Sequence, residues 1–92
     1  MSLDVFHKDV WFEGHVQGVG FRADVLGTAR GFEVSGVVKN LVDGRVLLQV
    51  EGREGEVTAF LSEVRARLGA FIRRVEERDF WGAPCFSGFA LA

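Results

Sequence analysis

The feature that most constrains this fold is the alternation of strand-like and helix-like hydrophobic spacing along its 92 residues. In the strand-like segments apolar and polar residues interleave, whereas in the helical ones apolar residues recur every three or four positions. Strands are expected at 10–16, 33–40, 45–51 and 73–80, helices at 21–30 and 57–68, and a candidate short fifth strand at 86–91. Asp43-Gly44 predicts a tight turn between the second and third strands. The predicted order is therefore β-α-β-β-α-β.

This order is typical of a ferredoxin-like α+β sandwich, a four-stranded antiparallel sheet with two helices on one face. Right-handed crossovers give the strand order 4-1-3-2, with the first and third strands at the centre. The loop after the first strand should then lie at mid-sheet, near Asn40 at the end of the second strand. Because no linker, repeat or low-complexity tract interrupts the chain, residues 1–92 are expected to form a single domain.

The segment from Gly14 to Arg22 combines the end of a strand, a glycine-rich loop and the start of a helix. Glycines let backbone N–H groups crowd together, and a helix N-terminus adds unpaired donors and a positive dipole. Arg22 supplies a permanent positive charge and a fork of donors beside them. We interpret this segment as a cradle for a phosphate-type oxyanion, although loop glycines taken alone more often reflect turn geometry.

Composition limits the partners of such a site. A net charge of −2 and a pI of about 5.6 argue against non-specific binding to nucleic acid or to anionic membranes. An anionic substrate must then be attracted by local groups. No apolar run approaches the length of a transmembrane helix and no signal peptide is visible, so a cytoplasmic, monomeric protein is expected.

Cysteine and histidine usage indicates neither a disulfide nor a metal site. Cys85 is the only cysteine and is expected to be a passive packing residue. His7 and His15 are expected to face solvent. Because no histidine or acidic cluster has the spacing of metal ligands, the sequence predicts a metal-free site without a cofactor.

The string Gly14-x-Val16-Gln17-Gly18-Val19-x-Phe21-Arg22 resembles the signature of the acylphosphatase family. Gly36-Val37-Val38-Lys39-Asn40 is similar to the second half of that pattern, and the resemblance covers nearly the whole chain. It also extends to the N-terminal acylphosphatase-like domain of hydrogenase-maturation carbamoyltransferases, which typically carry proline where this chain has Ala23. The family commonly has tryptophan at the position of Val37 and glycine at that of Glu33.

The resemblance implies a metal-free hydrolase that cleaves the carboxyl-phosphate bond of small acyl phosphates. It assigns the phosphoryl group to the loop amides and the arginine, and the attacking water to the asparagine. The phosphate-binding positions would be His15, Val16, Gln17, Gly18, Val19, Gly20, Phe21 and Arg22, and the catalytic ones Arg22 and Asn40.

Other functions fit parts of this pattern. A ferredoxin-like regulatory domain could bind phosphate or another ligand in the same cradle without turnover. RNA-binding modules of this fold need aromatics on the open sheet face in a basic setting, and no such string is present. Gly18-x-Gly20-x-x-Ala23 matches a loose dinucleotide fingerprint, but the chain is too short for a doubly wound sheet.

Overall fold

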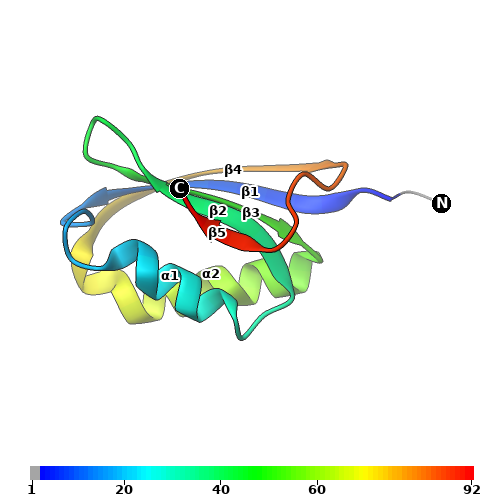
Figure 1. Ribbon diagram of the computed structural model, residues 1–92, viewed down its shortest axis with the longest axis horizontal. Helices are drawn as coiled ribbons and strands as arrows, with labels where there is room; N and C mark the ends of the chain where they lie inside the picture. Colours follow the sequence, from blue (N-terminus) through cyan, green and yellow to red (C-terminus); the bar gives the residue numbers. More distant parts are fainter. Residues whose placement is uncertain (1–2) are drawn as a thin grey trace.

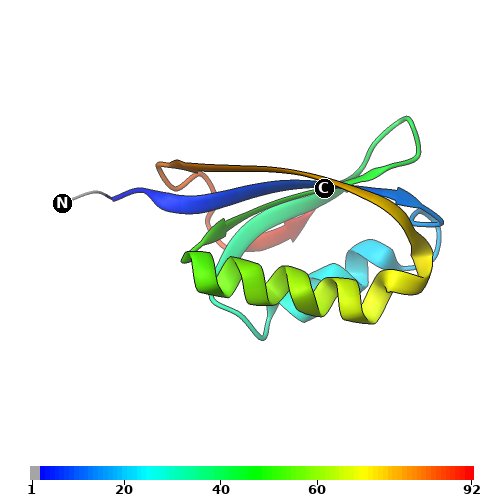
Figure 2. The same cartoon turned by 180° about the vertical axis from the view of Figure 1, so that it is seen from behind.

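A computed structural model describes residues 3–92 as a five-stranded sheet with two helices against one face (Figure 1). Along the chain the elements are β1 (Val5–Gly14), α1 (Phe21–Ala29), β2 (Val34–Asn40), β3 (Val46–Gly52), α2 (Glu54–Leu68), a 3-10 turn at Gly69–Phe71, β4 (Ile72–Gly82) and β5 (Phe89–Leu91). The view from behind shows both helices on the same side of the sheet, so its other face is open (Figure 2). No helix within 3–92 is both long and apolar enough to cross a membrane.

The strand order is β4-β1-β3-β2-β5, which confirms the predicted central position of the first and third strands. β1 pairs antiparallel with β3 and β4, and β2 pairs antiparallel with β3. The short β5 is present and runs parallel to β2, with Gly36 opposite Phe89. The sheet is therefore mixed, and the ferredoxin-like α+β fold is confirmed with its fifth strand at the edge.

The strand β1 begins at Val5, earlier than the predicted residue 10. Lys8 and Asp9 obscured this start, because two adjacent charges break the apolar alternation. In the fold both are ion-paired across to β4, Lys8 with Glu77 and Asp79, and Asp9 with Arg78. Burial alone would lower the pKa of Lys8, but the hydrogen bonds and charges of Glu77 and Asp79 outweigh it and raise that pKa.

The core lies between the helices and the inner face of the sheet. Inward residues of β1 and β3 alternate with outward ones, and α1 and α2 each add an apolar stripe at helical spacing. Fully buried members of this core include Val10, Phe12, Val16, Phe21, Val25, Val38, Val46, Leu48, Val50, Val57, Phe60 and Val64. Both ends of the loop after β1 are thus anchored in the core, through Val16 and Phe21.

Two expectations about single side chains are wrong. His7 is buried, because it stacks on the ring of Phe80 and its Nε2 lies 3.0 Å from the carbonyl oxygen of Ala83. Cys85 is exposed and packs no core, because it lies in the connection between β4 and β5. His15 is exposed, as expected.

Gly36 lets β2 pass unusually close to its neighbours. A Cβ at this position would lie 2.1 Å from the carbonyl oxygen of Gln49 on β3 and 3.1 Å from the ring of Phe89 on β5. No real Cβ tolerates the first of these distances, so the backbone would have to shift. Gly36 therefore fixes how β2 and β5 approach β3, and with them the position of Asn40 four residues on.

We predict that Gly36→Ala lowers the free energy of unfolding by about 1–3 kcal/mol, the usual cost of overpacking. Gly27→Ala is the matched control, because Gly27 is helical with nothing within 4 Å of its would-be Cβ. That variant should gain up to about 1 kcal/mol from higher helix propensity. Urea unfolding of both variants checks this, and equal stabilities would contradict the close approach at Gly36.

Candidate active site

The loop after β1, the first turn of α1 and the end of β2 meet around one small hollow of about 180 Å³. Residues far apart in sequence form its wall, because the sheet order puts β1, β3 and β2 side by side (Figure 1). The lining residues are Val16, Gly18, Gly20, Phe21, Arg22, Ala23, Asn40 and Leu91. Val16, Gly18, Gly20 and Phe21 of the predicted loop are therefore brought together with Arg22 and Asn40.

The loop backbone is shaped by Gly18 and Gly20, which both have φ of +79°. Only glycine adopts this left-handed conformation without cost. Within the described residues, the amides of residues 16–20 donate no backbone hydrogen bond. Gly20 caps α1 without a side-chain hydrogen bond, so the first-turn amides are also uncapped. The hollow thus gathers unpaired N–H donors at a helix N-terminus, where an anion is stabilised.

The predicted phosphate-binding residues fall into distinct groups. The side chains of Val16 and Phe21 are buried in the core, where Phe21 packs on Phe12 with ring centroids 5.2 Å apart. These two residues therefore offer only their backbone to a ligand. Val19, which is partly buried against the core, and Gln17 do not line the hollow. His15 does not line the hollow, and its N–H is donated to the carbonyl oxygen of Phe71 at 2.8 Å.

Arg22 is the second residue of α1 and is partly exposed at the hollow. Its Nη1 donates a hydrogen bond to the carbonyl oxygen of Ala92 at 2.7 Å. This contact holds the guanidinium against Ala92, which directly follows β5. A guanidinium has five N–H donors in all, so donors remain for a ligand. Arg22 therefore places a permanent positive charge beside the loop amides.

Asn40 is the last residue of β2, is exposed, and pairs with Val46, the first residue of β3. Its side chain carries both a donor and an acceptor, so it can hold a water molecule in either sense. The turn beyond it is ordered by Asp43. The backbone N–H of Arg45 and then its guanidinium bind the Asp43 carboxylate and lower the pKa of that group.

The side chain of Gln17 has a role that sequence reasoning missed. Its Nε2 donates to the carbonyl oxygens of Leu41 at 2.9 Å and Arg45 at 3.0 Å. Both carbonyls lie at the base of the turn between β2 and β3, because Leu41 directly follows Asn40 and Arg45 directly precedes Val46. Gln17 therefore ties the glycine loop to the strand end that carries Asn40. No local sequence signal reveals this link, because Gln17 is 24 residues from Leu41 and 28 residues from Arg45.

The positions at which the chain departs from the family pattern lie away from the hollow, Ala23 excepted. Val37 is half-buried in β2 and pairs with Gln49 and Ala90. Glu33 is exposed, is ion-paired with Arg53, and follows the end of α1. Neither residue lines the site.

Fold and hollow together define a class of small α+β domain that presents an anion cradle at the loop between its first strand and first helix. The family model for acylphosphatases matches residues 8–91 of this chain. An acylphosphatase from Bacillus pumilus is 44% identical over 85 residues, which cover 92% of each chain. The chain therefore belongs to the acylphosphatase family.

Solved structures of similar proteins share the fold of this chain. The crystal structure of acylphosphatase from Bacillus subtilis superposes with a TM-score of 0.84 at 26% identity, covering 95% of this chain and 98% of that one. The T. kodakarensis HypF structure superposes with a TM-score of 0.76 at 32% identity. That match covers 97% of this chain but 12% of the other, so the same domain also occurs within a much larger protein.

We predict that Gln17→Ala lowers the free energy of unfolding by about 1–2 kcal/mol, because two carbonyls lose their side-chain donor. Gln17→Glu should cost more, since a carboxylate would face the oxygens of Leu41 and Arg45. Gln49→Ala serves as control, because the Gln49 amide makes one long contact of 3.5 Å with Asp9. Urea unfolding measures all three. A Gln17→Glu variant as stable as the parent would show that the link is unimportant.

Proposed function

We propose that this protein is an acylphosphatase that hydrolyses the carboxyl-phosphate bond of small acyl phosphates to a carboxylate and inorganic phosphate. The observation that carries this proposal is the meeting of unpaired loop amides, Arg22 and Asn40 around one hollow in a member of this family. The curated relative from Bacillus pumilus and the solved Bacillus subtilis protein are both acylphosphatases.

The cradle binds the phosphoryl group of the substrate. The unpaired amides of the loop residues that line the hollow, Val16, Gly18 and Gly20, donate to its oxygens, and Arg22 adds a charge-assisted pair. Phosphoryl transfer spreads charge over the equatorial oxygens, so these fixed donors stabilise the transition state. Because the loop is anchored at Val16 and Phe21, the donors need little reorganisation when the substrate binds.

Asn40 orients the water that attacks phosphorus. A neutral amide suits this task, because it accepts from water without repelling the phosphoryl anion as a carboxylate would. The leaving group is a carboxylate of low basicity, so no strong general acid is needed. The reaction then rests on positioning and charge stabilisation, which amides and one arginine supply without a metal or cofactor.

We further propose that the enzyme works as a monomer in the cytoplasm. One chain supplies the loop, Arg22 and Asn40 together, so no second copy is required to complete the site. A single exposed free thiol at Cys85 suits a reducing compartment. The net charge of −2 argues against a nucleic-acid partner.

Hydrolysis of a small aromatic acyl phosphate, with and without chelator, tests the proposed function. We expect turnover that survives exhaustive chelation and changes little with added Mg²⁺. Binding of inorganic phosphate without any turnover would instead favour a regulatory phosphate-binding domain. Activity that is lost with chelator and restored by one divalent ion would contradict the metal-free mechanism.

Arg22→Ala should lower kcat/KM by about 100-fold or more, the scale of removing one preorganised donor from an oxyanion site. Arg22→Lys should rescue poorly, because a point charge cannot reproduce the planar fork. Arg30→Ala, at the exposed C-terminal end of the same helix, is the matched control and should retain normal activity. Near-normal kcat/KM in Arg22→Ala would show that the cradle is not the active site.

Asn40→Ala should lower kcat by about 100-fold while leaving inhibition by inorganic phosphate almost unchanged, because the asparagine positions water and not the phosphoryl group. Asn40→Asp should also be poor, since its charge repels the substrate. Steady-state kinetics with phosphate as inhibitor separates the two effects. If phosphate affinity collapses while kcat stays normal, Asn40 is a binding residue.

A further inference from the structure

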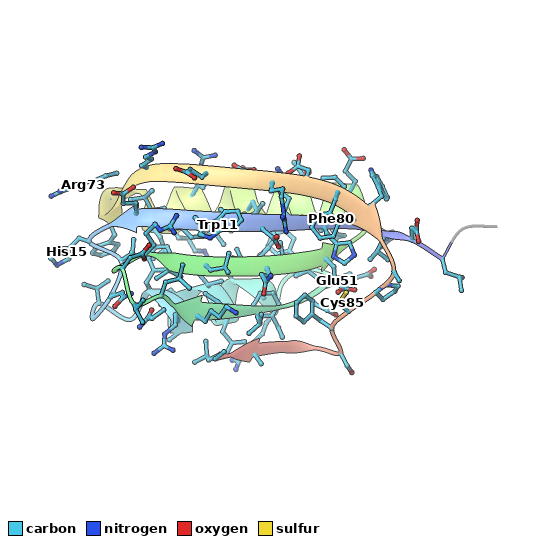
Figure 3. The ribbon with its side chains drawn as sticks, turned by 90° about the horizontal axis from the view of Figure 1, so that it is seen from above. Trp11, His15, Glu51, Arg73, Phe80 and Cys85 are labelled. Carbon is cyan, nitrogen blue, oxygen red and sulfur yellow. The ribbon has the colours of Figure 1, made fainter. Side chains whose placement is uncertain are left out.

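A second cluster of chemically active side chains lies on the open face of the sheet, at the end opposite to the hollow. His7 on β1 and Glu51 on β3 are direct cross-strand neighbours, and Cys85 comes from the connection between β4 and β5. Figure 3 looks onto this face and shows Glu51 and Cys85 side by side near Phe80. One ligand atom from each of the three residues lies within 4.8 Å of the other two.

Glu51 is held rigidly beneath this connection. Its side chain is buried, with 4% of the residue exposed, and its Oε1 accepts the backbone N–H of Cys85 at 2.7 Å and of Phe86 at 2.9 Å. The hydrogen bonds fix the backbone of Cys85 over the carboxylate, so the thiol position is defined by the same contacts.

His7 is equally constrained. It is 3% exposed, stacks flat on Phe80 with ring centroids 4.6 Å apart, and turns Nε2 toward the carbonyl oxygen of Ala83 at 3.0 Å. The Sγ of Cys85 lies 3.5 Å from that same oxygen. The imidazole of His7, the thiol of Cys85 and the carboxylate of Glu51 thus lie close together, and Cys85 is exposed to solvent.

The cluster is separate from the proposed active site. His7 precedes Gly14, where the glycine loop begins, by seven residues of β1. At the rise of an extended strand this is roughly 23 Å. The acyl phosphate chemistry therefore uses none of these three side chains.

We propose that His7, Glu51 and Cys85 bind one divalent transition-metal ion of the Zn²⁺ type. A neutral imidazole, a carboxylate and a thiolate form a mixed N, O, S donor set that suits Zn²⁺ or Co²⁺ and disfavours Mg²⁺ and Ca²⁺. Donors bonded to Zn²⁺ at 2.0–2.3 Å stand roughly 3.3–3.8 Å apart in a tetrahedron, so atoms within 4.8 Å of one another must draw together by up to about 1–1.5 Å. The ion would join β1, β3 and the β4–β5 connection.

Binding is accompanied by a defined proton balance. The Cys85 thiol loses its proton to solvent and binds as the thiolate. In the structure Nε2 lies 3.0 Å from the carbonyl oxygen of Ala83 and 3.3 Å from that of Gly82, so it carries the imidazole proton. To bind an ion through Nε2, His7 moves this proton to Nδ1 and gives up both contacts, and the Glu51 carboxylate loses no proton. One proton is therefore released per ion, so the apparent affinity rises with pH.

Titration of the reduced full-length chain with Co²⁺ tests the proposal by absorption spectroscopy. We expect one Co²⁺ per chain, a thiolate-to-cobalt charge-transfer band in the near ultraviolet, tighter binding as pH rises from 6 to 8, and loss of the band when Zn²⁺ displaces Co²⁺. Excess Zn²⁺ should also raise the Tm, because the folded chain alone holds the assembled site.

Cys85→Ser is the decisive variant, because the exposed thiol packs no core and the backbone N–H that binds Glu51 is kept. It should abolish the charge-transfer band, weaken Co²⁺ binding by more than about tenfold and remove the Zn²⁺-dependent rise in Tm. His7→Gln should weaken binding similarly. His15→Gln, which changes the other, exposed histidine, is its matched control and should bind Co²⁺ like the parent.

The circular dichroism spectrum of each variant first establishes that it is folded. If His7→Gln unfolds, Cys85→Ser alone decides the question. A parent chain without the thiolate band, or a folded Cys85→Ser variant that binds Co²⁺ as tightly as the parent, would overturn the proposal. The acyl phosphatase assay is not needed for this test, so a failed metal site and a failed catalytic proposal remain distinguishable.

Discussion

The anchoring of the glycine loop in the hydrophobic core is the constraint on which the rest of the site depends. Val16 and Phe21 are each 1% exposed, and they hold the two ends of a segment whose middle carries Gly18 and Gly20. Between these anchors the backbone has few conformations left, and the positive φ values select the one that leaves amides unpaired. Core packing therefore determines where an anion can bind, and the donors require no side chain beyond Arg22.

The sheet positions Asn40, the remaining group of the site. Because β2 pairs with β3 and β3 with β1, the end of β2 stands beside the loop, and Gln17 bonds the two together. Gly36 permits the tight approach of β2 to β3 that keeps Asn40 in this place. The protein has a net negative charge, but this hollow is lined by neutral residues and by Arg22, so it can attract an anionic substrate locally.

Much of this arrangement could be predicted from the sequence, because hydrophobic spacing, helix-ending glycines and the Asp43-Gly44 turn are local signals. These signals predict the order of the elements, and the right-handedness of the crossover connections then predicts the order of the strands in the sheet. Side-chain environments that depend on distant partners could not be predicted. His7 is buried by Phe80 and Ala83, more than seventy residues later, and the donors to Glu51 come from residues 85 and 86. The hydrogen bonds of Gln17 are hidden for the same reason.

The central claim is that the amides of the loop after β1, together with Arg22, form the phosphoryl-binding cradle. Titration of ¹⁵N-labelled protein with inorganic phosphate, followed by NMR, tests it most directly. We predict saturable shifts of the backbone amides between residues 16 and 22 and of the Arg22 guanidinium, with His15 and the open face of the sheet little changed. Shifts gathered instead on the exposed arginines 73 and 74, or no saturable shift in the loop, would contradict it.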